Sequence, residues 1–357
     1  MRQFHKLSIA RLEHETADSV RLSLAVPAEL QAKFFFQPGQ HLPVQATIGG
    51  KLTRRTYSIC SVPGQWPMEI GIRVQPGGKF SEFVANELKA GDLLEVMPPF
   101  GQFHASIDPG NARIYLGFAA GSGITPILSI VRALLEGEPK SRFLLFYGNR
   151  RLRTTMFVDD LYALKNRFPE RLQLYFLFSQ EDQEFPIFDG RLDQEKTEAL
   201  CDTFLRGLAP DQAFICGPDT MIESVRAALQ QYGLRDEEVH TERYGAPRQK
   251  AAPVDVRRVA ADAEATQVTV IMDGHEKTFS MTSQHGNIVD AAAAQGIELP
   301  YSCKGGVCAT CRTWVREGEV RMDANYGLEP WEIDKGYVLA CQSHPASRKL
   351  VLDYDKT

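Results

Sequence analysis

Four cysteines near the carboxyl end of the chain have a spacing that suits metal binding. They follow the pattern C-x4-C-x2-C and then, after 29 intervening residues, a fourth cysteine: Cys303, Cys308, Cys311 and Cys341. Four thiolates at this spacing hold the two irons of a 2Fe-2S cluster. The residues between the ligands are small, so the backbone can curl tightly and direct N–H groups at the sulfurs. They are Gly305, Gly306, Ala309 and Thr310.

A structural zinc site and incidental thiols are the alternatives for these four cysteines. Structural zinc usually shows two paired C-x2-4-C knuckles, and only one such pair occurs in this segment. Unrelated thiols would not give this spacing around a Gly-Gly pair. The other three cysteines, Cys60, Cys201 and Cys216, share no such pattern, and we expect them to be small buried residues.

Two short motifs in the first hundred residues could bind a flavin. In the first, R-x-Y-S, side chains two apart share one face of a strand, so a cation for a diphosphate and an aromatic plane for a ring could meet one ligand. Its residues are Arg55, Thr56, Tyr57 and Ser58. In the second, a Gly-rich turn leads into a helix through Leu88 with Ser81 as its expected N-cap, which is an anion site. Its residues are Gly78, Lys79, Phe80 and Ser81. Taken separately, a plain strand and a simple turn with a cap would explain them as well.

Another glycine-rich segment follows an expected buried strand at residues 113–119. Its two glycines permit close approach of a pyrophosphate to a helix N-terminus, with Thr125 as the expected N-cap and Pro126 at the first helical position. The segment is Gly121, Ser122, Gly123, Ile124, Thr125 and Pro126. It lacks the third glycine of the ordinary dinucleotide fingerprint. The last strand of the same region ends in Cys216, Gly217 and Pro218, where ligands of parallel sheets collect, although a buried cysteine before a turn is the simpler interpretation.

One arginine-rich turn bears on whether the protein prefers NADPH or NADH. Arg150, Arg151 and Arg153 follow an expected strand and could bind a 2′-phosphate through their guanidinium groups. They could equally form a solvated face, and Glu181 would repel a phosphate if it pointed inward. The sequence favours NADPH, with NADH as the alternative.

The order of hydrophobic patterns predicts a multidomain fold. Short alternating strands over residues 1–108 predict an antiparallel β-barrel for the flavin, and buried strands alternating with amphipathic helices over 109–245 predict an α/β parallel-sheet domain for the nucleotide. Residues 246–266 lose both periodicities and are expected to be a linker. Residues 267–357, which contain a hairpin around Asp273-Gly274 and the cysteine loop, are expected to form an α+β, β-grasp ferredoxin domain.

Composition and charge exclude several classes of protein. The 357 residues are 43% hydrophobic and carry a formal net charge of −5, which excludes a disordered or collagen-like chain. The sequence lacks the clustered Lys and Arg that nucleic-acid binding requires and the apolar run that a membrane span requires. We therefore expect no nucleic-acid or membrane partner and a cytoplasmic location. The eight His are expected to be surface or barrel residues, and no Ser/His/Asp or paired-carboxylate arrangement is evident.

The motifs resemble two known families. Residues 267–357 are similar to plant-type ferredoxins, and the order and spacing of the flavin and nucleotide motifs resemble the ferredoxin-NADP reductase family. That resemblance implies that Arg55 and Ser81 serve the FAD phosphates, that Tyr57 packs on the isoalloxazine, and that Ser58 lies near its reactive nitrogen. It places Cys216 beside the nicotinamide, and it relates Glu242 and Tyr244 in HTERYG to the family's terminal acidic and aromatic positions. Tyr57, Ser58 and Cys216 are thus the expected catalytic residues, and Tyr244 would cover the flavin until nicotinamide displaces it.

The order of modules resembles the reductase components of multicomponent oxygenases. Within that group, stretches such as PGQH, LEVMPPFGQF, AAGSGITP and LPYSCKGGVCATC are most similar to the reductases of ring-1,2-phenylacetyl-CoA epoxidases. The resemblance implies that electrons pass from NADPH through FAD and the 2Fe-2S cluster, one at a time, to a di-iron oxygenase partner of bacterial phenylacetate degradation. A reductase of another aromatic-ring oxygenase and a free-standing diaphorase remain alternatives. A non-enzymatic redox sensor is disfavoured because it needs no hydride donor.

Overall fold

A computed structural model describes residues 3–244, 266–282, 284–328 and 330–356. The chain forms two compact units, one over Phe4–Tyr244 and one that contains the described residues from Thr266 onward. Each unit is described by itself. The expected linker at 246–266 lies outside the described residues, except that Thr266 is already the first residue of a strand.

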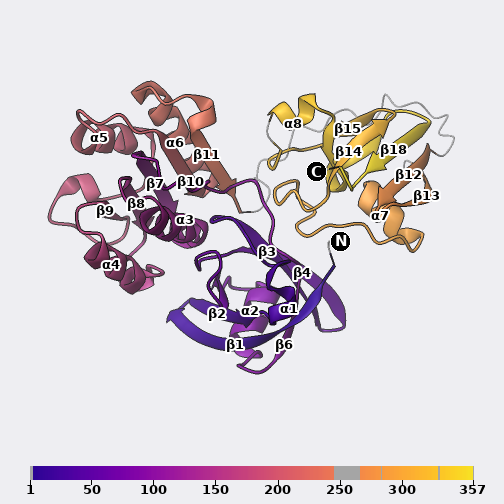
Figure 1. Cartoon of the computed structure of the whole chain (residues 1–357), viewed down its shortest axis with the longest axis horizontal. Coiled ribbons are helices and arrows are strands. Elements are labelled where there is room, and N and C mark those ends of the chain that lie inside the picture. Colours follow the sequence, from indigo (N-terminus) through magenta and orange to yellow (C-terminus); the bar gives the residue numbers. More distant parts are fainter. Residues whose placement is uncertain (1–2, 245–265, 283, 329, 357) are drawn as a thin grey trace. The chain divides into compact units, whose positions relative to one another are not determined.

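The amino-terminal part of the first unit is the expected antiparallel barrel (Figure 1). Its six strands pair in the order β4-β3-β6-β1-β2-β5. An antiparallel bridge between Ile59 and Ile70 joins the segment after β4 to β5 and closes the barrel. Alternate apolar side chains fill the interior, because successive residues of a strand point to opposite faces. The strands are β1 (His5–Thr16), β2 (Ser19–Ala25), β3 (His41–Ile48), β4 (Lys51–Ser58), β5 (Met68–Arg73) and β6 (Leu93–Val96), with helices α1 (Ala28–Gln31) and α2 (Lys79–Asn86).

The rest of the first unit is a parallel sheet in the order β11-β10-β7-β8-β9. Strands β7, β8, β9 and β10 are largely apolar runs, because helices cover both faces of the sheet: α3 and α4 on one side, α5 and α6 on the other (Figure 1). Gly233, in the left-handed conformation at φ 110°, ends α6 as expected. The elements are β7 (Ile114–Ala120), α3 (Ile124–Gly137), β8 (Arg142–Asn149), α4 (Val158–Arg167), β9 (Leu172–Phe178), α5 (Gln194–Phe204), β10 (Gln212–Gly217), α6 (Asp219–Tyr232) and β11 (Val239–Arg243).

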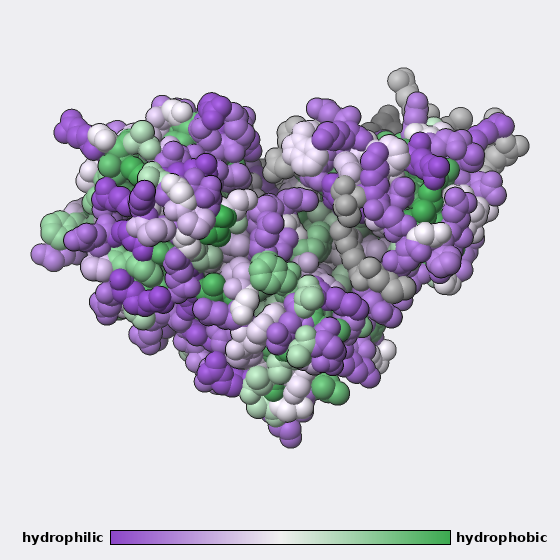
Figure 2. All heavy atoms as spheres, viewed as in Figure 1, coloured by the Kyte–Doolittle hydropathy of each residue, from purple (hydrophilic) through white to green (hydrophobic). Residues whose placement is uncertain are grey.

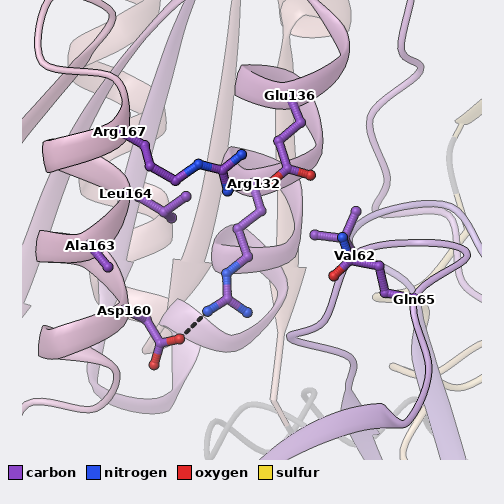
Figure 3. Close-up of a pocket in the computed structure, with 8 residues that line it drawn as sticks. All are labelled: Val62, Gln65, Arg132, Glu136, Asp160, Ala163, Leu164 and Arg167. Carbon is purple, nitrogen blue, oxygen red and sulfur yellow. Dashed lines mark hydrogen bonds and ion pairs between the residues drawn. The ribbon is translucent and has the colours of Figure 1, made fainter.

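An ionic network joins the barrel to the helices of the parallel-sheet domain. Asp160 of α4 forms ion pairs with Arg21 of β2 and with Arg132 of α3. Arg132 also donates to the carbonyl oxygen of Cys60, at 2.9 Å. Figure 3 shows Arg132 and Asp160 at a cavity of about 300 Å³, with Val62 and Gln65 of the barrel on the opposite side. The charges lining this cavity are mutually compensated, because Arg167 in turn pairs with Glu136.

The second unit contains a five-stranded mixed sheet in the order β13-β12-β18-β14-β16. Its first two strands form the expected hairpin, in which Asp273 and Gly274 both have positive φ, as a type I′ turn requires. The central pair β12 and β18 is parallel, and α7 packs against this sheet (Figure 1). The elements are β12 (Thr266–Met272), β13 (His275–Met281), α7 (Ile288–Ala294), β14 (Arg312–Glu317), β15 (Val320–Met322), α8 (Pro330–Asp334), β16 (Tyr337–Leu339), β17 (Ser343–Pro345) and β18 (Lys349–Asp353).

Polar side chains cover much of the visible face of each unit, and apolar side chains are scattered among them (Figure 2). Among the described residues, no helix combines the length and the apolar character needed to cross a bilayer.

Candidate functional site

Four polar side chains from distant parts of the chain meet where β4 and β11 end. The Ser58 hydroxyl donates to Glu242 Oε2 at 3.1 Å and shares a hydrogen bond of 3.0 Å with the Tyr244 hydroxyl. His41 Nδ1 lies 3.2 Å from Glu242 Oε1. Three of these residues were predicted from the sequence, and the structure brings those three together in one hydrogen-bonded group.

The parallel sheet explains why these residues converge. In the register of β10 with β11, Cys216 lies opposite Glu242, and in that of β10 with β7 it lies opposite Ala119. The carboxyl ends of three neighbouring strands therefore share one edge, where ligands of such sheets bind. Cys216 is fully buried at this edge. Burial, and to a lesser degree the charge of Glu242, raises the pKa of the Cys216 thiol well above its ordinary value, so the thiol stays protonated.

Tyr244 contributes a ring that is only partly covered. Its side chain is 45% exposed, although its hydroxyl also lies 3.4 Å from the carbonyl oxygen of Ser122, which it can reach as a donor. A ring that is hydrogen-bonded at one end and open on its surface can be displaced without disturbing a packed core.

His41 also joins this group, although its sequence pattern did not single it out. We expected the histidines to be surface or barrel residues, and His41 is a barrel residue, the first of β3, that is buried and contacts Glu242. Its only sequence signal is its position in PGQH, at the start of a strand. Its partner lies 201 positions further along the chain, so no local pattern could reveal the contact.

The loop at residues 121–126, which we expect to bind the nucleotide, contains two glycines that serve different purposes. Gly121 has φ 54°, which favours glycine, and the space beside it is open to a ligand. Gly123 is needed for packing instead, because a Cβ there would lie 2.0 Å from the carbonyl oxygen of Cys216. The hydroxyl of Tyr147 supports the loop by donating to the carbonyl oxygen of Gly121 at 2.9 Å.

The expected capping roles in this loop are wrong. Residues Gly121–Gly123 form a single 3-10 turn, and α3 begins at Ile124 with Gly123 as its N-cap. Thr125 is therefore the second helical residue, and its hydroxyl donates backwards to the carbonyl oxygen of Ser122 at 2.8 Å. Pro126 is the third, where its missing N–H costs nothing because helices leave their first N–H groups unpaired. Pro218 likewise occupies the N-cap of α6, and Gly217 packs against Met221.

The residues of the expected flavin motif lie at the end of β4. Arg55 is exposed and Tyr57 is half-buried, with its ring 6.0 Å from the ring of Phe80 on α2. Burial raises the pKa of Tyr57, so its hydroxyl remains neutral. Thr56, half-buried, lies opposite Pro43 of β3.

The helix after the second glycine-rich turn begins earlier than expected. Helix α2 starts at Lys79 with Gly78 as its N-cap and ends at Asn86, so Ser81 is not the cap. A Cβ on Gly78 would lie 2.6 Å from Ser81 Oγ, which leaves room only for glycine. Ser81 accepts from the N–H of Gln75 and donates to the carbonyl oxygen of Gly78, so it shapes the turn. The first hydrogen bond within the helix runs from the Glu82 N–H to the carbonyl oxygen of Gly78. The helical N–H groups before Glu82 therefore make no bond within the helix.

The arginine-rich turn lies at the end of β8. Arg150, Arg151 and Arg153 are exposed, and none of them forms an ion pair with a residue of the described ranges. Glu181 points at the same turn, since its carboxylate accepts from the N–H of Leu152 at 3.0 Å. Positive and negative charges thus lie together at the turn that the sequence predicts as a 2′-phosphate site.

The four cysteines of the second unit form two pairs. Cys303 and Cys308 exchange backbone-to-sulfur hydrogen bonds at 3.4 Å, and the N–H of Cys341 donates to Cys311 Sγ at 3.5 Å. Within the described residues, no three potential ligands gather closely enough to hold a single ion. Two pairs of thiols are the arrangement in which two irons take two ligands each.

The loop backbone is shaped around these sulfurs. Lys304, Gly306 and Ala309 all have positive φ, which curls the chain tightly. The N–H of Gly305 donates to Cys303 Sγ at 3.3 Å, as expected for a cluster loop. The contact between the two thiols, together with these N–H groups, lowers the pKa of Cys303, and the same contact raises the pKa of Cys308, so the pair shares a proton.

The folds and sites together define the class of protein. A barrel, a nucleotide-binding parallel sheet and a cysteine-loop domain are the parts of a flavin- and iron-sulfur-dependent oxidoreductase. Family models match all three in the same order: an oxidoreductase FAD-binding domain at residues 6–105, an oxidoreductase NAD-binding domain at 118–227, and a 2Fe-2S iron-sulfur cluster binding domain at 270–346. FAD, a nicotinamide nucleotide and a 2Fe-2S cluster are therefore its cofactors.

Curated relatives define the family. The chain is 41% identical to a subunit of the 1,2-phenylacetyl-CoA epoxidase of Escherichia coli, over 99% of both chains. It is 33% identical to the ferredoxin reductase component of the 3-ketosteroid-9-alpha-monooxygenase of Rhodococcus rhodochrous, over 98% of this chain and 96% of the relative. The chain belongs to this family of ferredoxin-NADP reductase-type reductase components with a carboxyl-terminal 2Fe-2S domain. Among solved structures, phthalate dioxygenase reductase has the same fold, with a TM-score of 0.59, 24% identity and 98% coverage of both chains.

Proposed function

We propose that this chain is the reductase of a multicomponent oxygenase and passes electrons from NADPH, through FAD and the 2Fe-2S cluster, to a separate di-iron oxygenase. When bound, FAD links two-electron to one-electron chemistry, and the cluster carries one electron at a time. The 41% identical relative supports phenylacetyl-CoA as the substrate of that oxygenase. The cytoplasm is the location that we propose.

The observation that carries the proposal is the hydrogen-bonded group of Ser58, Glu242 and Tyr244. It joins the end of a barrel strand to the carboxyl edge of the parallel sheet, so a flavin bound by one domain would meet a nicotinamide bound by the other. A redox sensor would have no use for such a meeting point.

We assign this chain's residues to the cofactors as follows. Arg55 and the start of α2, with Gly78, Lys79, Phe80 and Ser81, hold the FAD phosphates, while Thr56, Tyr57 and Ser58 line the flavin ring. Gly121, Ser122, Gly123, Thr125 and Pro126 form the pyrophosphate loop of the nucleotide. Cys216, Gly217, Pro218 and Glu242 border the nicotinamide, which displaces Tyr244. Cys303, Cys308, Cys311 and Cys341 ligate the cluster.

We propose NADPH as the preferred nucleotide, with NADH as the alternative. Three exposed arginines near the carboxyl edge, of which Arg150 is closest to β8, favour a 2′-phosphate, and the single carboxylate of Glu181 opposes it.

The experiment is an anaerobic titration of the holoprotein with NADPH, followed by turnover assays. We expect the flavin and cluster absorbance to bleach, and we expect steady NADPH consumption to require a purified phenylacetyl-CoA oxygenase. Absence of bleaching with both NADPH and NADH would rule out the electron relay. Full turnover with a quinone or ferric complex, and no stimulation by the oxygenase, would favour the free-standing diaphorase.

A further inference from the structure

His41 and Ser58 hold the two oxygens of one carboxylate. His41 Nδ1 contacts Glu242 Oε1 at 3.2 Å, and Ser58 Oγ donates to Oε2 at 3.1 Å. The two residues are direct cross-strand neighbours in the β3–β4 pair. A single barrel hairpin therefore fixes the orientation of a carboxylate that belongs to the parallel-sheet domain.

The imidazole is locked in place by its surroundings. Its ring meets the edge of Phe100 at a centroid distance of 4.9 Å and an interplanar angle of 82°. The backbones of these two residues exchange hydrogen bonds of 3.0 Å. Gly101 also lies against the ring, since a Cβ at this position would lie 3.0 Å from the imidazole.

Only one ring nitrogen has a partner among the described residues. His41 Nε2 is buried and makes no hydrogen bond, whereas Nδ1 faces Glu242. Because an ionised carboxylate only accepts hydrogen bonds, Nδ1 must carry the proton of this contact. The contribution of His41 to the site is thus a single donor at the Nδ1 position.

We propose that His41 is a positioning residue for the reaction with the nicotinamide nucleotide, and that it keeps Glu242 and Ser58 in place when Tyr244 leaves. Tyr244 shares the Ser58 hydroxyl at 3.0 Å, so its displacement removes one of the partners of Ser58. The contact from His41 to the other oxygen of Glu242 does not depend on Tyr244. The carboxylate therefore stays oriented to hold Ser58 through the displacement. This inference rests on the proposed function of the site.

The position of the donor can be tested with three substitutions. In an asparagine at position 41, the amide nitrogen can occupy the place of the imidazole Nδ1. In a glutamine, the amide nitrogen can occupy the place of Nε2, and a leucine supplies no donor. The measurement is the rate of flavin reduction by NADPH in anaerobic stopped-flow mixing, as a function of NADPH concentration, on flavin-loaded His41→Asn, His41→Gln and His41→Leu. His5→Asn, a barrel histidine that packs against Phe34 outside this site, is the control.

We expect His41→Asn to stay within about threefold of the wild-type limiting rate, and His41→Gln and His41→Leu to fall about ten- to hundredfold, since small misplacements are costly in such sites. The half-saturating NADPH concentration and the flavin spectrum should not change in any variant. Equal rates in all variants, or an asparagine variant as slow as the leucine variant, would overturn the inference. If the wild-type flavin is itself not reduced by NADPH, the proposed function fails instead.

Discussion

Individual side chains at the two redox sites differ in how far the sequence could predict them. The cysteines proposed as cluster ligands could be singled out because three of them lie within nine consecutive residues, so their spacing is itself the signal. Glu242 and His41 carry no such signal, since their contact depends on two strands from different domains.

At this scale, Cys308→Ser should remove the cluster and leave the flavin site working. Cys308 lies in the second unit, whereas the residues assigned to flavin and nucleotide lie within Phe4–Tyr244. We expect loss of iron, sulfide and cluster absorbance, with ferricyanide reduction by NADPH retained. Cys201→Ser, at a buried thiol of α5, is the control and should keep its iron. Electron delivery to the oxygenase by the Cys308 variant would contradict the proposed order.

The nucleotide preference should respond in opposite directions to two substitutions at one turn. Arg150→Leu removes a cation and should raise the KM for NADPH about tenfold while that for NADH changes little. Glu181→Gln keeps an acceptor for the Leu152 N–H but removes the negative charge, so the KM for NADPH should fall. Initial rates with both nucleotides provide the measurement, and equal effects on NADH and NADPH would show that no 2′-phosphate binds here.

At the scale of elements, the end of α3 depends on one buried carboxylate. Glu138 follows the helix and accepts hydrogen bonds from the Tyr115, Ser141 and Asn111 side chains and from the Asp108 N–H, all between 2.7 and 3.0 Å. Burial alone would raise its pKa, but these donors outweigh burial and lower it. The carboxylate thereby ties the segment that leaves the barrel to the first helix of the parallel-sheet domain.

Replacement of Glu138 should destabilise this domain in a pH-dependent way. Glu138→Leu leaves buried donors unpaired and should cost about 3 kcal/mol at pH 7, or about 6–12 °C in Tm. Because the folded-state pKa is lowered, the stabilisation is present above the unfolded value of about 4.3 and is lost as the pH falls through the folded value. The gap between wild type and variant in thermal unfolding should therefore narrow at pH 4. The control Glu136→Leu, at a partly exposed ion pair, should cost no more than about 1 kcal/mol.

Helix starts were the least predictable feature at this scale. Ser81 and Thr125 are residue types that favour N-caps, yet both lie inside the first turn and bond backwards to the loop. Capping preference is local, whereas the actual start was set by close packing of Gly78 and Gly123 against their neighbours.

For the whole molecule, the three redox groups share one polypeptide, and this has a kinetic consequence. Once the flavin has been reduced, reduction of the cluster should be a unimolecular step. Its rate constant in anaerobic stopped-flow experiments should stay the same when the protein concentration is raised tenfold. A rate proportional to concentration would show that electrons pass between molecules, and the relay within one chain would then be wrong.

The sequence by itself determined the order of domains and the cofactor classes and predicted the cluster ligands, because hydrophobic period and ligand spacing are properties of consecutive residues. Only the tertiary structure decided which polar groups meet at the carboxyl edge of the parallel sheet. Ser58 and Glu242 are 184 positions apart, and His41 and Glu242 are 201 apart. Their contact exists because parallel register brings the carboxyl ends of β7, β10 and β11 to one edge and the barrel hairpin packs against it. No local pattern encodes such a meeting, because its energy comes from the packing of whole elements.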